Sequence, residues 1–158
     1  GIVDKYDKKH TFTLAGENEA YKAGNTKTII NYKGWKICLQ ICYDLRFPAW
    51  SRNLEDYDLL IYVANWPVAR VQAWDSLLKA RAIENMSYTI GVNRVGIDAN
   101  KHQYSGNSLI INFLGEECAS LAANEEGFVA ATINKNTQRE CRNKLGFLKD
   151  RDKFKIKS

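Results

Sequence analysis

Residues 34–48 read Gly34-Trp35-Lys36-Ile37-Cys38-Leu39-Gln40-Ile41-Cys42-Tyr43-Asp44-Leu45-Arg46-Phe47-Pro48, and this stretch decides the fold. Its first half is an apolar run rich in β-formers, which predicts a buried strand, and the polar Tyr43-Asp44 pair ends that strand just beyond Cys42. Pro48 suits the first turn of a helix, and large apolar side chains continue at helical spacing. We therefore predict a strand, a cysteine, a tight turn and a helix from about Phe47 to Tyr57.

Cys42 stands where the predicted strand stops, and two interpretations of its thiol compete. Near the N-terminal end of a helix, unpaired N–H groups favour the reactive thiolate and can also hold an oxyanion. A free cysteine is, however, among the most buried of residues, which favours core packing. Cys38 lies on the same face of the predicted strand, and we expect it to be core packing.

Four motifs in order along the chain resemble those of one family. Ile41 to Pro48 resembles the nucleophile motif of the nitrilase superfamily, the carbon–nitrogen hydrolases. Tyr62-Val63-Ala64-Asn65-Trp66-Pro67 and Ala80-Arg81-Ala82-Ile83-Glu84-Asn85 are similar to two further signatures, and Tyr6-Asp7-Lys8-Lys9-His10 is similar to the lysine motif. The resemblance runs nearly from Gly1 to the C-terminal tail. It is closest to the ω-amidases, which hydrolyse the side-chain amide of 2-oxo acids such as 2-oxoglutaramate.

The resemblance implies three catalytic residues. Cys42 would be the nucleophile, and the ammonium of Lys8 would stabilise the developing oxyanion. Glu17 matches the auxiliary glutamate that holds the lysine and the substrate in place, and Glu19 is the alternative carboxylate. Lys9 is the nearest rival of Lys8 and belongs on the opposite face of an extended segment.

Tyr43, Asn65, Trp66 and Arg70 are the predicted substrate-binding residues. Trp66 could equally be core or pocket wall, and its position in the family favours the pocket. Arg70 is a candidate to hold the carboxylate of a 2-oxo acid amide through a bidentate pair.

Other polar residues near the predicted site have open roles. Asn93 and Arg94 resemble the polar end of a strand near the family's site, although a structural hydrogen-bonding role is equally compatible. His102 and His10 are weighed because Cys-His pairs make hydrolases. The family uses Glu, Lys and Cys without a histidine, so neither is expected to be catalytic.

In the family, a substantial N-terminal part of the fold precedes the lysine motif and carries a catalytic glutamate. Here Ile2 and Val3 lead at once into the charged segment that begins at Asp4. We therefore expect residues 1–158 to be the C-terminal part of one domain, completed by an N-terminal segment elsewhere. Without that segment, unpaired sheet edges and an exposed apolar face are expected.

The remaining pattern predicts an α/β fold, which the resemblance makes a nitrilase-like αββα sandwich, incomplete at its N-terminal side. Residues 14–24 read as a loop or short helical turn, and residues 96–106 read as a polar loop. The expected helices cover residues 71–86 and 134–145, with Trp74, Leu77, Leu78, Ile83 and Met86 on the apolar face of the first. The expected strands cover residues 26–32, 58–64, 87–94, 108–113, 117–122 and 128–133, of which the last three are expected to be an antiparallel finish to the sheet. Lys33-Gly34 is expected to be a hairpin turn into the strand of Cys42. A crossover from that strand to residues 58–64 would place Cys42 and Asn65-Trp66 at corresponding strand ends. Residues 146–158 are expected to be a loosely ordered tail.

Bulk composition narrows the class of protein. The 158 residues are 45% hydrophobic, which suffices for the core of one unit. The 23 basic and 18 acidic residues are interspersed, so the net charge of +5 predicts no nucleic-acid face. No apolar run approaches the roughly 18 residues of a membrane span, and no signal peptide is evident. Four cysteines without paired spacing predict no structural zinc and a reduced, cytoplasmic protein.

The function implied is hydrolysis of a small 2-oxo acid amide through a cysteine thioester, without metal or organic cofactor. A homodimer is implied by the resemblance alone. Two alternatives stay open: another C–N substrate, such as a nitrile, a carbamoyl amine or an aliphatic amide, or an inactive fragment serving as a binding module.

Overall fold

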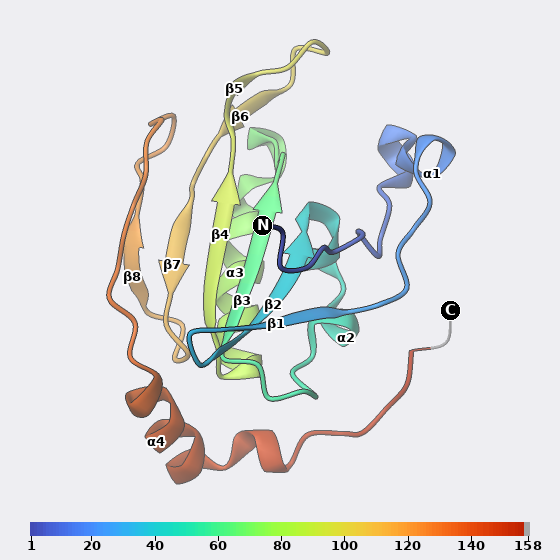
Figure 1. Ribbon diagram of the computed structural model, residues 1–158. Helices are drawn as coiled ribbons and strands as arrows, with labels where there is room; N and C mark the ends of the chain where they lie inside the picture. The colour runs from blue at the N-terminus through green and yellow to red at the C-terminus, as the bar shows by residue number, and fades with distance from the viewer. Residues whose placement is uncertain (157–158) are drawn as a thin grey trace.

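The strand that precedes Cys42 lies one position from the edge of a six-stranded sheet (Figure 1). The computed structural model describes residues 1–156, and the sheet order is β1-β2-β3-β4-β7-β8, with β5 and β6 forming a separate hairpin. The strands are β1 (Thr28–Tyr32), β2 (Trp35–Ile41), β3 (Leu59–Ala64), β4 (Tyr88–Asn93), β5 (Val95–Ile97), β6 (Gln103–Ser105), β7 (Leu109–Ile111) and β8 (Glu117–Ser120). The helices are α1 (Glu17–Ala20), α2 (Pro48–Ser51), α3 (Val71–Asn85) and α4 (Lys135–Leu145), with 3-10 helices at Thr13–Ala15, Cys42–Arg46, Val68–Arg70 and Phe147–Lys149.

The strand pairing around Cys42 follows the prediction. β1 and β2 are antiparallel, and Lys33 and Gly34 between them have φ angles of 47° and 79°, as a two-residue hairpin turn requires. β2, β3 and β4 are parallel, whereas β7 and β8 add to β4 as the predicted antiparallel finish. The carboxyl ends of the three parallel strands therefore meet at one edge, where Ile41 pairs with Val63.

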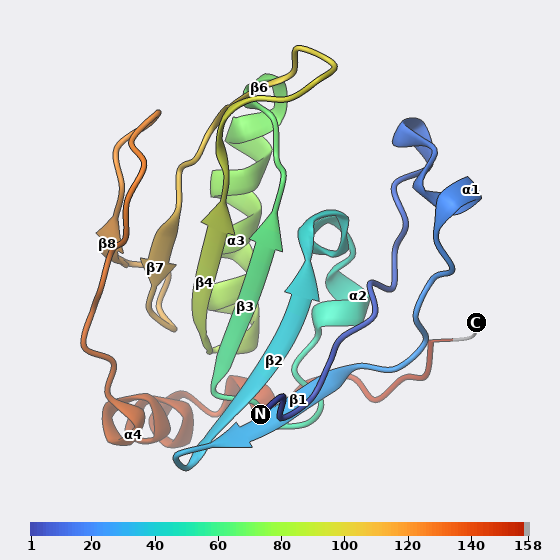
Figure 2. The same cartoon turned by 45° about the horizontal axis from the view of Figure 1, so that its top comes forward.

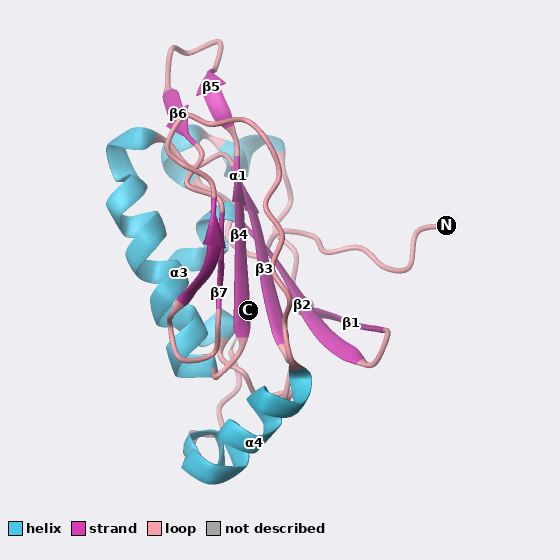
Figure 3. Ribbon diagram, turned by 90° about the vertical axis from the view of Figure 1, so that its left-hand side faces the viewer, coloured by secondary structure: helices cyan, strands magenta, loops and turns pink. Residues whose placement is uncertain are grey.

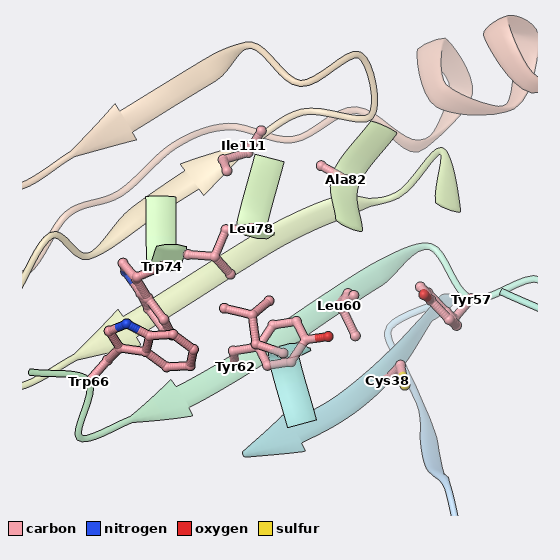
Figure 4. Packing of buried hydrophobic residues seen from close by; sticks show 10 residues of the cluster. Cys38, Tyr57, Leu60, Tyr62, Trp66, Trp74, Leu78, Ala82 and Ile111 are labelled. Atoms are coloured by element: carbon pink, nitrogen blue, oxygen red, sulfur yellow. The ribbon is translucent and has the colours of Figure 1, made fainter. Parts of the chain in front are cut away.

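Helix α3 covers one face of the sheet, behind β3 and β4 (Figure 2). The predicted helix over residues 71–86 is confirmed, and Met86, with a φ angle of 45°, ends it. Gly91 of β4 lets α3 approach closely, because a Cβ there would lie 2.4 Å from Leu78. The core on this face is one cluster of buried side chains (Figure 4), formed by Cys38, Leu45, Tyr57, Leu60, Tyr62, Trp66, Trp74, Leu78, Ala82 and Ile111.

Helix α4 lies at the foot of the opposite face (Figure 3). Its N-cap is Asn134, whose side chain accepts a hydrogen bond from the amide of Thr137. Beneath it lies a second buried cluster of Leu59, Tyr88 and Phe113. The start of the predicted tail is held by buried Leu148 and by an ion pair between Arg151 and Asp56, whereas residues 157 and 158 of that tail lie outside the described part of the chain.

The rest of that opposite face is apolar and open. Ile41, Val63 and Val92 are neighbours across β2, β3 and β4, and both valines are 48% exposed. The α/β class is confirmed. Of the two sheets in the predicted αββα sandwich, residues 1–156 form one, together with the helices that pack on it. None of the helices in residues 1–156 is long and apolar enough to cross a bilayer.

The predicted helix from Phe47 to Tyr57 is wrong beyond its first turn, because α2 ends at Ser51. The side chain of Asn53 is the physical reason. Its amide accepts from the N–H of Tyr57 and donates to the carbonyl of the same residue, and both bonds form at 2.9 Å. A buried asparagine that satisfies the backbone in this way replaces the helical hydrogen bonds.

Three smaller predictions also need correction. Residues 128–133 form no strand, and Phe128 is 92% exposed. The polar loop over residues 96–106 instead contains the β5–β6 hairpin, which Asp98 organises by accepting from the amides of Asn100 and His102. Ile83 of α3, predicted on the apolar face, is 49% exposed.

Candidate active site

Cys42 lies at the junction between β2 and the 3-10 helix Cys42–Arg46. Its φ angle of 44° is left-handed, a conformation that costs a non-glycine residue about 1–3 kcal/mol and clusters at functional sites. Its Sγ lies 3.9 Å from the carbonyl oxygen of Asn65, which follows β3. The two motifs predicted to meet at the carboxyl edge of the sheet therefore do meet.

Lys8 and Glu17 form an ion pair beside this junction. Lys8 Nζ lies 2.6 Å from Glu17 Oε2, and the lysine side chain is only 13% exposed. The same carboxylate oxygen accepts from the amide of Phe12 at 2.8 Å, which fixes its orientation. The alternatives lie elsewhere: Glu19 is exposed, and the ammonium of Lys9 lies 5.5 Å from the ring centre of Trp50.

A buried carboxylate, that of Asp44, joins the lysine segment to the nucleophile turn. Asp44 Oδ1 accepts from the backbone N–H of His10 at 2.9 Å and lies 2.8 Å from His10 Nδ1. Its Oδ2 accepts from the hydroxyl of Tyr6 at 2.8 Å and from the backbone N–H of Ile41 at 3.1 Å. The side chain of Asp44 is fully buried, so all four contacts are shielded from water.

The charge state of Cys42 is set by opposing effects. Burial raises the pKa of the Cys42 thiol above its ordinary value, and the neighbouring Lys8 ammonium lowers that pKa without cancelling the rise. Desolvation is thus the largest of these effects on the thiol. The sulfur therefore needs a base to take its proton before it can attack.

Of the predicted substrate-binding residues, Tyr43 and Arg70 both contact one aromatic ring, that of Phe12. The ring of Phe12 is 4.8 Å from that of Tyr43, and the guanidinium carbon of Arg70 is 5.4 Å from the centre of the Phe12 ring. No carboxylate within residues 1–156 pairs with Arg70. A half-buried arginine stacked on an aromatic ring and free of an acid partner is suited to an anionic ligand.

Asn65 is exposed beside Cys42, whereas Trp66 belongs to the core. The indole of Trp66 is 3% exposed, packs on Trp74, and donates its N–H to the carbonyl of Arg70 at 2.7 Å. Asn93 clamps the Trp66 backbone, accepting from its N–H at 2.7 Å and donating to its carbonyl at 2.9 Å. Of the two roles open for Asn93, the structure shows the hydrogen-bonding one.

The two histidines contact other groups. The His10 ring stacks on Phe47 with 3.6 Å between ring centres and faces Asp44 through Nδ1. His102 lies on the β5–β6 hairpin, with its Nδ1 3.6 Å from Asp98. Within the described part of the chain, neither ring is hydrogen-bonded to Cys42.

Two hollows open at a distance from Cys42. One of about 360 Å³ lies between α3 and strands β7 and β8, and one of about 610 Å³ lies along β1 and the N-terminal segment. Cys42, Lys8 and Glu17 line neither of them. Residues 1–156 thus present the thiol without enclosing it in either hollow.

Comparison with known proteins identifies the family. The family model for carbon-nitrogen hydrolases matches residues 1–143. The chain belongs to the carbon-nitrogen hydrolase family. It is 48% identical over 156 residues to the omega-amidase YafV of Escherichia coli K12, covering 99% of this chain and 61% of that protein. It is 35% identical over 151 residues to the 2-oxoglutaramate amidase of Bacillus subtilis, covering 94% of this chain and 58% of that one.

A solved carbon-nitrogen hydrolase superfamily structure, XC1258 of Xanthomonas campestris, superposes with a TM-score of 0.93 at 42% identity. The match covers 96% of this chain and 60% of XC1258, whose structure has an arsenic adduct in the active site. The predicted family and fold are therefore confirmed. The chain spans about three fifths of the length of the relatives it matches.

Sequence reasoning missed Asp44 as part of the site. The sequence pattern marks Asp44 only as part of the polar pair that ends a strand. The signal was nevertheless present, because an acid directly after a buried strand needs several hydrogen-bond donors, and Tyr6 and His10 on either side of Lys8 supply them.

Proposed function

We propose that the protein hydrolyses the terminal amide of a small 2-oxo acid amide, of the 2-oxoglutaramate type, to the carboxylate and ammonia. The observation that carries this proposal is the strained Cys42 beside the partly buried Lys8–Glu17 ion pair. The names of two relatives, an omega-amidase and a 2-oxoglutaramate amidase, support the substrate class.

In the first half-reaction, the Cys42 sulfur gives its proton to a base and attacks the amide carbon. The negative charge moves onto the carbonyl oxygen, where the Lys8 ammonium and the backbone N–H beside Cys42 stabilise it. The C–N bond then breaks as the nitrogen takes up the proton, and ammonia leaves. A thioester remains on Cys42.

In the second half-reaction, a base takes a proton from water, and the resulting hydroxide adds to the thioester carbon. The C–S bond breaks, the acid leaves, and the sulfur recovers a proton. Glu17 is an unsuitable base because one of its oxygens is already bound by Lys8 and by the amide of Phe12. We assign the acid–base role to the glutamate that the family carries in its N-terminal part.

The open apolar face supports the proposal that a complementary N-terminal segment packs on this sheet. Beyond the cluster under α4, this face presents two rows of side chains across the parallel strands, Leu39, Ile61 and Ile90 in one and Ile41, Val63 and Val92 in the other, of which the second is the more exposed. Packing a second sheet on such a face would bury these side chains and complete the sandwich. A homodimer, taken from the resemblance, and a cytoplasmic location, taken from the unpaired cysteines, are further parts of this proposal.

Arg70 is the proposed carboxylate-binding residue. Arg70→Lys keeps the positive charge but loses the planar fork, so the KM for 2-oxoglutaramate should rise about tenfold with a smaller effect on kcat. An unchanged KM would remove Arg70 from the proposal.

The test of the function is ammonia release from 2-oxoglutaramate by the protein and by its Cys42→Ala variant. We expect release that depends on Cys42. A panel containing an aliphatic nitrile, a carbamoyl amine and an aliphatic amide decides the substrate class, and preference for the nitrile would contradict the assignment. Absence of turnover with every substrate, in the presence of the glutamate-bearing N-terminal segment, would favour the binding-module alternative.

A further inference from the structure

We propose that Asp44 is a positioning residue, which holds the Lys8 segment against the nucleophile turn and thereby keeps the ammonium beside Cys42. The inference rests on the proposed roles of Cys42 and Lys8. It goes beyond them, because Asp44 would act on the reaction only through these two residues.

The contacts of Asp44 are arranged as a clamp. One carboxylate oxygen accepts from the backbone of His10 and faces its ring nitrogen, and the other accepts from Tyr6 and from the backbone of Ile41. Tyr6 and His10 each lie two residues from Lys8, one before it and one after it. Ile41 directly precedes the nucleophile. The carboxylate therefore connects the residues on both sides of Lys8 to Ile41, the residue before Cys42.

The partners of the clamp are themselves held. The Tyr6 hydroxyl accepts from the indole N–H of Trp50 at 2.9 Å, and its donated proton goes to Asp44. The ring of His10 lies flat on Phe47, with an interplanar angle of 3°. Trp50 and Phe47 both follow the nucleophile turn, so the lysine segment is attached to that turn by side chains as well as by the carboxylate.

The proposal makes a prediction whose sign separates it from a direct electrostatic effect. The Asp44 charge raises the pKa of Cys42, whereas the Lys8 ammonium lowers it. If Asp44 acted only through its charge, removing that charge would lower the pKa of the thiol. If it positions Lys8, removing it frees the ammonium and the pKa of the thiol rises.

The other groups that affect the pKa of Cys42 are the same in the parent and in a variant without the Asp44 charge. Glu17 raises the pKa of Cys42, a backbone hydrogen bond of Asn65 lowers it, and the phenol of Tyr104 lies close enough on the β5–β6 hairpin to interact with the sulfur. None of them contacts Asp44 through a recorded hydrogen bond in residues 1–156.

The experiment measures the rate of Cys42 alkylation by iodoacetamide as a function of pH, resolved by peptide mass spectrometry. It needs no substrate, so its outcome does not depend on whether the amidase assignment is correct. In Asp44→Asn we expect the apparent pKa of Cys42 to rise by about one pH unit, which lowers the alkylation rate near neutral pH about tenfold. Lys8→Met should show the same rise, and the double variant should show no more than either single one.

Asp7→Asn is the matched control, because Asp7 lies in the same segment with an exposed side chain, and it should leave the profile unchanged. Cys38, which is fully buried, reports on the fold, since unfolding would make it reactive. If Asp44→Asn fails to fold, Tyr6→Phe decides, because it breaks one arm of the clamp and keeps the charge of Asp44. A fall or no change in the apparent pKa of Cys42 in the folded variants would overturn the proposal.

Discussion

At the residue scale, burial and neighbouring charges act in opposite directions on the pKa of the Cys42 thiol. A thiol, an ammonium and two carboxylates lie at one end of β2, and burial outweighs the favourable effect of Lys8 on the Cys42 thiolate. The ion pair of Lys8 with Glu17 is partly shielded from water. Partial shielding strengthens electrostatic interactions, so the effect of the ammonium on Cys42 depends strongly on the distance between them.

Lys8→Met should lower kcat for amide hydrolysis about 100- to 1,000-fold, because one preorganised donor to the oxyanion is lost. Lys9→Met is its matched control, since the Lys9 ammonium lies over Trp50, and its activity should stay within about twofold of the parent. Steady-state ammonia release measures both. A loss in Lys9→Met that equals the loss in Lys8→Met would show that the wrong lysine has been assigned.

Cys38 provides a pH-dependent test of the core. Burial raises the pKa of Cys38 to about 12 from its ordinary value near 9, so between these values the folded chain holds a proton that the unfolded chain has lost. Stability must therefore fall as the pH rises through this range, by up to about 1.4 kcal/mol per pH unit from this one group.

Cys38→Ala removes that titration at the cost of a small cavity, about 1 kcal/mol at pH 7. The gap in unfolding free energy between parent and variant should close at roughly pH 9 to 10 and change sign by about pH 11, in urea titrations at each pH. A gap that stays constant across this range would show that Cys38 does not titrate as its burial implies.

At the element scale, helices and strands with a regular sequence pattern are predicted correctly. The prediction fails where a single side chain takes over the hydrogen bonds of the backbone. The hairpin at Lys33-Gly34, the parallel crossover and α3 follow from periodicity and turn residues. The helix expected beyond Ser51 does not form, because the Asn53 side chain takes the hydrogen bonds of Tyr57. No periodicity contains that information.

The site divides in the same way. Cys42, Lys8 and Glu17 could be named from motifs, but the role of Asp44 depends on residues 34 and 38 positions away in the chain, which only the fold brings together. The placement of Trp66 in the core also depends on its packing with Trp74 across the crossover.

Gly91 is the point where α3 lies closest to β4. Gly91→Ala would place a methyl group 2.4 Å from Leu78 and 2.7 Å from Trp74, and overpacking of this kind should cost about 1–3 kcal/mol of unfolding free energy. Gly127→Ala is the control, because its nearest neighbour is Leu121 at 3.8 Å. Chemical denaturation of both variants decides, and equal stabilities would contradict the close packing of α3.

At the scale of the whole molecule, Asp58 ties the C-terminal helix to the sheet. Its carboxylate lies 2.6 Å from Lys135 Nζ and 3.5 Å from Arg142 Nη1, and it also accepts from the backbone N–H of Lys36. Burial lowers the pKa of Arg142, and Asp58 opposes that effect. These contacts join residues 77 and 84 positions apart.

Asp58→Asn should destabilise the protein by about 3 kcal/mol, because Lys135 and the largely buried Arg142 lose their counter-charge. Asp56→Asn should cost less than about 1 kcal/mol, since the pair of Asp56 with Arg151 has a carboxylate that is 63% exposed. Thermal unfolding of the two variants provides the comparison. A larger effect of Asp56→Asn would contradict the assignment of Asp58 as the main anchor of α4.

The central claim is that Cys42 carries the acyl group between the two half-reactions. The most direct measurement is peptide mass spectrometry of the protein quenched in acid during turnover of 2-oxoglutaramate. We predict that the peptide containing Cys42 gains the mass of the product acid less one water, and that Cys42→Ala neither gains it nor releases ammonia. An adduct on another residue, or ammonia release that continues undiminished in Cys42→Ala, would contradict the account.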